Sequence, residues 1–68
     1  MGFETRVLNT VQEVAPHSDA SFSNNVLAVS NISADVATEI EDALCKFVLG
    51  LVTWRYDARN SEFKFTFH

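Results

Sequence analysis

Three side chains in this sequence have the chemistry of a nucleophile or a general base: Cys45, His17 and His68. A catalytic cysteine acts as a thiolate, which a nearby histidine or another positive group stabilises. Glu41 and Asp42 precede Cys45 closely, and neighbouring carboxylates disfavour a thiolate. No motif brings either histidine toward Cys45. We therefore predict no catalytic residues and no enzymatic activity.

The spacings that hold cofactors and metals are also missing from the sequence. It has no Gly-rich phosphate loop, no nucleophile elbow and no Cys/His pattern of the zinc-binding type. Carboxylates on a helix without a nearby histidine are a poor ligand set for a metal. We expect neither a cofactor nor a metal.

An acidic stripe is the first candidate for binding. Asp35, Glu39 and Asp42 have the spacing i, i+4 and i+7, which places them along one side of a helix. Such a stripe would attract a protein partner with a basic surface. The alternative is a solvated helix face on which Lys46 pairs with Asp42.

A second candidate lies in the last third of the chain, where three of the five basic residues fall: Arg55, Arg59 and Lys64. They suggest a sheet face that binds single-stranded nucleic acid. The net charge of −4 makes nucleic acid an unlikely partner, because phosphate binding normally needs a basic face. Other side chains expected on that face can contact phosphates but cannot stack on bases: Thr53, Thr66 and His68.

The elements that position these residues begin with a helix predicted over 34–49. Ser33 is a good N-cap, Asp35 suits the positive end of the helix dipole, and Gly50 fits the position after the helix. The apolar residues that share one side of this helix are Val36, Ile40, Ala43, Leu44, Phe47, Val48 and Leu51. Cys45 and Leu49 fall on the opposite side and form a candidate dimer contact.

A hairpin is predicted from strands 52–57 and 62–67, which alternate apolar and polar residues. A loop centred between Arg59 and Asn60 sets Tyr56 opposite Phe63, and the same register continues along both strands. All the apolar side chains then share one sheet face. The polar face opposes like charges, and we expect two diagonal ion pairs to offset them: Arg55 with Glu62 and Asp57 with Lys64.

Three segments precede the helix 34–49. Residues 3–15 carry apolar side chains within an arc of about 140° on a helix, although their Val and Thr content also fits a strand. We favour a helix and keep the strand as an alternative. Residues 16–25 are polar and predict a loop, anchored by Phe22. Residues 25–30 predict a strand.

Together these elements predict a small two-layer α+β domain of order αβαββ, or ββαββ if 3–15 is a strand. A right-handed crossover makes strands 25–30 and 52–57 parallel. Strand 62–67 then lies between them, antiparallel to both. The result is a mainly antiparallel three-stranded sheet with the helix 34–49 on its aromatic face.

Length and composition limit the remaining choices. With 68 residues the chain is one domain, 1–68, near the lower size limit for folding alone, so a homodimer is expected. A single cysteine excludes an internal disulfide and favours a cytoplasmic location. No segment has the roughly 18 apolar residues that cross a bilayer, and no signal peptide is visible.

These observations favour a small acidic protein-protein interaction module without catalysis. Its size and charge are typical of inhibitors or adaptors encoded by phages and other mobile elements. Two alternatives remain: a single-stranded nucleic-acid-binding protein that uses the open sheet face, and a structural subunit of a homo-oligomer.

Overall fold

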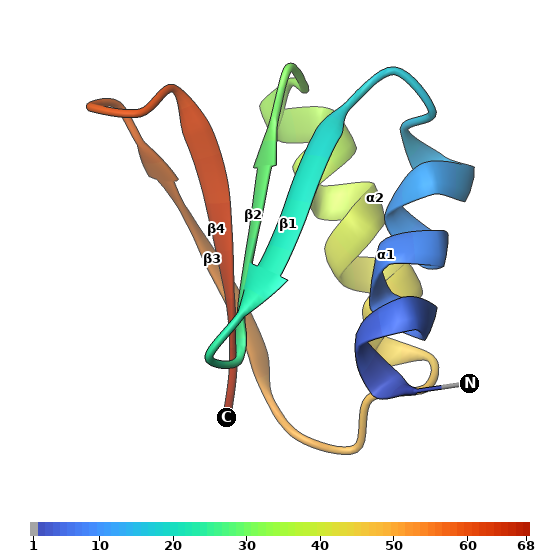
Figure 1. Cartoon of the computed structure of the whole chain (residues 1–68). Coiled ribbons are helices and arrows are strands. Elements are labelled where there is room, and N and C mark those ends of the chain that lie inside the picture. Colours follow the sequence, from blue (N-terminus) through green and yellow to red (C-terminus); the bar gives the residue numbers. More distant parts are fainter. Residues whose placement is uncertain (1) are drawn as a thin grey trace.

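In a computed structural model, which describes residues 2–68, two helices cover one face of a four-stranded antiparallel sheet and leave the other face open (Figure 1). The elements in chain order are α1 (Phe3–Val14), β1 (Asp19–Ser23), β2 (Val26–Ser30), α2 (Ala34–Cys45), β3 (Val52–Asp57) and β4 (Glu62–Phe67). The strand order β1-β2-β4-β3 confirms that the last strand lies between the strands before and after α2. The predicted α+β class is confirmed, but the order is αββαββ.

The helix favoured over residues 3–15 is confirmed as α1. Val7 and Val11, one helical turn apart, are both buried, while the polar residues Glu4 and Glu13 face solvent. The burial of this i, i+4 pair against the sheet outweighs the strand preference of Val and Thr.

The prediction of a loop over 16–25, and of only three strands, was wrong. Residues 19–23 form an edge strand, β1, antiparallel to β2. The sequence did not reveal this strand because only Phe22 packs against the core, while Asp19 and the serines are exposed. Asn24 and Asn25 both have positive φ, 50° and 61°, which is the geometry of a two-residue hairpin turn and a conformation that asparagine tolerates.

The predicted helix 34–49 begins as expected but ends at Cys45. The Ser33 hydroxyl accepts a hydrogen bond from the Val36 N–H at 3.4 Å, which confirms the N-cap. At the other end the carbonyl of Leu44 accepts from the N–H groups of both Phe47 and Val48, and the chain turns away from the helix axis.

Gly50 does not have the positive φ expected of a helix-terminating glycine, so that role was predicted wrongly. It is instead a site of close backbone approach, since a Cβ added there would overlap the carbonyl oxygen of His68. The N–H of His68 also donates to the carbonyl of Leu51 at 2.9 Å. Leu51, expected in the core, is 65% exposed because the helix never reaches it.

The hairpin register is confirmed: Tyr56 lies opposite Phe63, Trp54 opposite Phe65, and Val52 opposite Phe67. The apolar face of the hairpin lies under the helices, as predicted. Tyr56 is the exception, with 53% of its surface exposed, because it stands on the edge strand near the hairpin loop.

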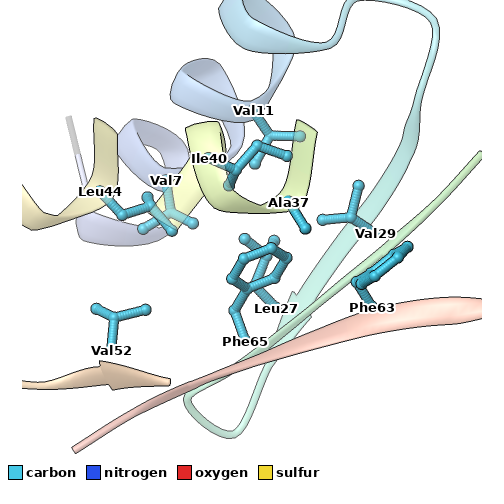
Figure 2. Close-up of a cluster of buried hydrophobic side chains, with 10 residues drawn as sticks. All are labelled: Val7, Val11, Leu27, Val29, Ala37, Ile40, Leu44, Val52, Phe63 and Phe65. Carbon is cyan, nitrogen blue, oxygen red and sulfur yellow. The ribbon is translucent and has the colours of Figure 1, made fainter. Parts of the chain in front are cut away.

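The core lies between the two layers and takes side chains from both (Figure 2). Helix residues such as Ile40 and Leu44 point toward strand residues such as Leu27 and Phe65, and all four are fully buried. No polar or charged residue among residues 2–68 is buried. The interior is therefore wholly apolar, and any binding chemistry lies on the surface.

Candidate functional site

Helix α2 carries all the excess negative charge of the chain. It holds four carboxylates and no basic residue: Asp35, Glu39, Glu41 and Asp42. Outside α2, five acidic residues are balanced by five basic ones, because nine acidic residues less these four leaves five. The three residues of the predicted stripe are exposed on the helix, as the spacing requires.

The expected pairing of Lys46 with Asp42 does not form. The only ion pair within residues 2–68 joins Lys64 and Asp57, in the hairpin. The α2 carboxylates therefore face solvent without a cation to neutralise them, and α2 presents a local negative potential.

An apolar groove of about 390 Å³ opens at the end of the domain where α2 stops. It is lined by Phe3 from α1, Asn25 from the β1–β2 turn, segment 47–50, and Phe67 and His68 at the end of β4. Figure 1 shows the start of α1, the β1–β2 turn, the connection from α2 to β3 and the C-terminus together at this end. Sequence reasoning placed Phe47 and Phe67 in the core and missed the groove, which is lined by the residues that follow the early end of the helix.

Packed phenylalanines form the wall of this groove. The Phe3 ring makes edge contacts with Phe22, Phe47 and Phe67, at centroid distances of 6.0, 6.3 and 5.7 Å. The Arg6 guanidinium lies 4.6 Å from the centroid of Phe47, a cation–π contact. These rings pack edge to face against one another, although Phe3 itself stays 46% exposed.

Leu49 is fully exposed at the edge of the groove, at 104% of its reference surface. Cys45 is also exposed, as predicted, but it ends α2 and does not share a helical face with Leu49. The two residues of the candidate dimer contact therefore lie on different segments: the thiol ends the helix, and the apolar side chain lies on the connection beyond it.

The open sheet face holds a second, polar hollow of about 260 Å³ over β3 and β4. Arg55 and Lys64 are direct cross-strand partners there, and Thr53 and Thr66 form the next pair. The imidazole Nε2 of His68 lies 3.2 Å from the Thr53 hydroxyl. Arg59, grouped with Arg55 and Lys64 by sequence, stands apart in the hairpin loop.

Asp57 organises the hairpin loop beside this hollow. Its carboxylate accepts from the Arg59 N–H at 3.0 Å and from the Asn60 side chain at 2.9 Å, and it pairs with Lys64 at 3.2 Å. The hydrogen bond from Asn60, followed by that from Lys64, lowers the pKa of Asp57 below its ordinary value. The predicted diagonal pair of Asp57 with Lys64 is confirmed, whereas that of Arg55 with Glu62 does not form.

The candidate nucleophile and bases are not assembled into a site. His17 lies in the loop between α1 and β1, and Figure 1 shows this loop at the opposite end of the domain from the end of α2, where Cys45 lies. In the part of the chain that the structure describes, no group of three or more His, Cys, Asp and Glu side chains is placed to hold a metal. None of the helices in residues 2–68 is long and apolar enough to cross a membrane.

Comparison of the chain with protein-family models, with curated proteins and with solved structures found no significant match. The molecule presents two candidate binding surfaces: the acidic face of α2 with the adjoining apolar groove, and the polar hollow on the open sheet face.

Proposed function

We propose that this protein is an interaction module that binds another protein through the apolar groove and the acidic face of α2. The observation that carries the proposal is the fully exposed Leu49 beside a groove walled by phenylalanines. A contiguous apolar surface with a polar rim is typical of protein-protein interaction sites. Aromatic side chains, phenylalanine among them, are enriched at the core of such sites.

The partner is a protein segment with an apolar side chain near basic residues. Its apolar side chain fills the groove, and its basic residues face the unpaired carboxylates of α2. The groove lies at the C-terminal end of α2, so one partner can contact both. The two parts of the surface have different roles: the groove provides affinity, and the charge of α2 increases the rate of encounter. An inhibitor or adaptor of a larger protein, encoded by a phage or other mobile element in the cytoplasm, would act in this way.

The single exposed cysteine offers a direct test. A photocrosslinker attached to Cys45 lies at the end of α2 nearest the groove, and it should capture the partner in host extract. The matched control carries Cys45→Ser and Glu13→Cys, which moves the crosslinker to the far end of α1, about 15 Å along the helix from Phe3. Capture at both positions would indicate nonspecific labelling.

Capture must then respond to substitutions at the proposed surface. Leu49→Ser should raise the dissociation rate about tenfold or more, because an apolar anchor is lost. Asp35, Glu39 and Asp42 changed together to Ser should slow association and flatten its salt dependence without unfolding the protein. Unchanged affinity in the triple variant would remove the acidic stripe from the proposal. Capture of a second copy of the chain would mean that the surface forms a homodimer and does not bind a different protein.

A further inference from the structure

The polar hollow on the open sheet face is lined almost entirely by hydrogen-bond donors. Five side chains from β3, β4 and the residue after β4 surround it: Thr53, Arg55, Lys64, Thr66 and His68. Trp54 also borders the hollow, but its ring packs on the other face of the sheet, against Phe63 and Phe65. The volume of about 260 Å³ is several times the roughly 30 Å³ that one water occupies in the liquid.

One of the two cations in this hollow, Arg55, has no ion-pair partner among residues 2–68. Arg55 and Lys64 lie directly opposite each other, and like charges in that position destabilise a sheet. Lys64 has Asp57 as its partner, but Arg55 forms no ion pair within residues 2–68. An anion between the two cations would relieve their repulsion and give Arg55 a partner.

We propose that this hollow binds the phosphate group of a small phosphorylated molecule. Arginine and lysine form strong charge-assisted hydrogen bonds with phosphate, and arginine can present two parallel N–H groups. The paired hydroxyls of Thr53 and Thr66 add donors one step along the same face. His68, in hydrogen-bond contact with Thr53, closes that end of the hollow.

The arrangement suits one phosphate better than a nucleic-acid backbone. Asp57 and Glu62 form the cross-strand pair between the Arg55–Lys64 pair and the hairpin loop that carries Arg59. These two carboxylates would repel a polyanion running along the strands from one cationic position to the next. The net charge of −4 acts against a polyanion as well.

The test is a titration followed by amide NMR shifts at low ionic strength, with inorganic phosphate, glycerol 3-phosphate and a single-stranded oligonucleotide, and with glycerol as the uncharged control. We expect saturable shifts at residues 53–55 and 64–68 with both phosphates and none with glycerol. Arg55→Gln and Lys64→Gln should each weaken binding about 10- to 100-fold, the usual effect of losing a charged hydrogen bond. The matched control Arg59→Gln should leave it unchanged.

Asp57→Asn provides a variant with the opposite expected effect. It frees Lys64 from its ion pair, so phosphate should bind about two- to fivefold more tightly. Three results would overturn the proposal: no shifts on this face, equal shifts around Arg6 and Lys46 (adventitious binding only), or oligonucleotide binding that is tighter and depends on Arg59. The spectrum of each free variant shows whether it is folded. Only His68 lines both this hollow and the groove, so the variants at Arg55, Lys64 and Asp57 test phosphate binding without altering the groove proposed for the protein partner.

Discussion

The same replacement, leucine by alanine, made separately at Leu44 and at Leu49, tests the core and the proposed docking surface. They lie five residues apart, yet Leu44 is completely buried and Leu49 completely exposed. Figure 2 shows Leu44 in the core beside Val7. We predict that Leu44→Ala destabilises the protein strongly and that Leu49→Ala does not.

The two variants should lose very different amounts of unfolding free energy. Leu44→Ala should cost about 3–5 kcal/mol, because it removes buried contacts and leaves a cavity. A chain of 68 residues has a total stability of only about 3–10 kcal/mol. Leu44→Ala should therefore lower the melting temperature by at least about 12 °C, at about 4–8 °C per kcal/mol. Leu49→Ala removes no buried contact and should stay within about 0.5 kcal/mol.

Thermal and urea unfolding followed by circular dichroism would measure both variants. A drop of more than about 4 °C for Leu49→Ala would refute the reasoning, since it would show that Leu49 is buried in the free protein. Repeating the melt over a range of protein concentrations then identifies the cause. A drop in melting temperature that depends on protein concentration would mean that a second copy covers Leu49.

Two further predictions concern the hairpin and the connection after α2. Asp57 has a lowered pKa, so its ionised form contributes stability that is present above its unfolded pKa of about 3.9 and is lost as the pH falls through the folded value. The stability difference between the wild type and Asp57→Asn should therefore be constant near neutral pH and shrink below about pH 4; urea melts that show a constant difference into strong acid would contradict this. Gly50→Ala should destabilise the protein and shift the amide signals of His68 and Thr53, because the new Cβ displaces the His68 carbonyl. Signals at His68 identical to those of the wild type would show that the close approach is absent.

The elements with strong periodicity were predictable from sequence. Alternation in the hairpin fixed its register, because any shift by one residue would place aromatics on the charged face. The start of α2 followed from the Ser33 cap, and α1 from the spacing of its buried valines. These features depend on local patterns that burial reinforces.

The missed features depend on long-range contacts that leave little local signal. β1 is an edge strand with one partner and few core side chains, so its composition resembles a loop. The asparagine pair at its turn was the available signal, since both residues adopt positive φ. The early end of α2 follows from the path back to β3 and from the contact of Gly50 with His68, which are 18 positions apart. Because the groove is built from that contact region, the sequence did not reveal it.

The positions of the two proposed sites follow from a single property of the fold: helices cover only one face of the sheet. On the covered face, apolar side chains reach the end of the domain, where the helices no longer shield them, and Phe3, Phe67 and Leu49 become accessible. On the open face, every residue of β3 and β4 is polar, and the only apolar side chains of the neighbouring strand β2 there are the small, half-buried Val26 and Ala28. His68 borders both hollows. A protein partner and a phosphorylated ligand would therefore occupy adjacent but chemically distinct surfaces, and substitutions at Leu49 and at Arg55 should separate their effects.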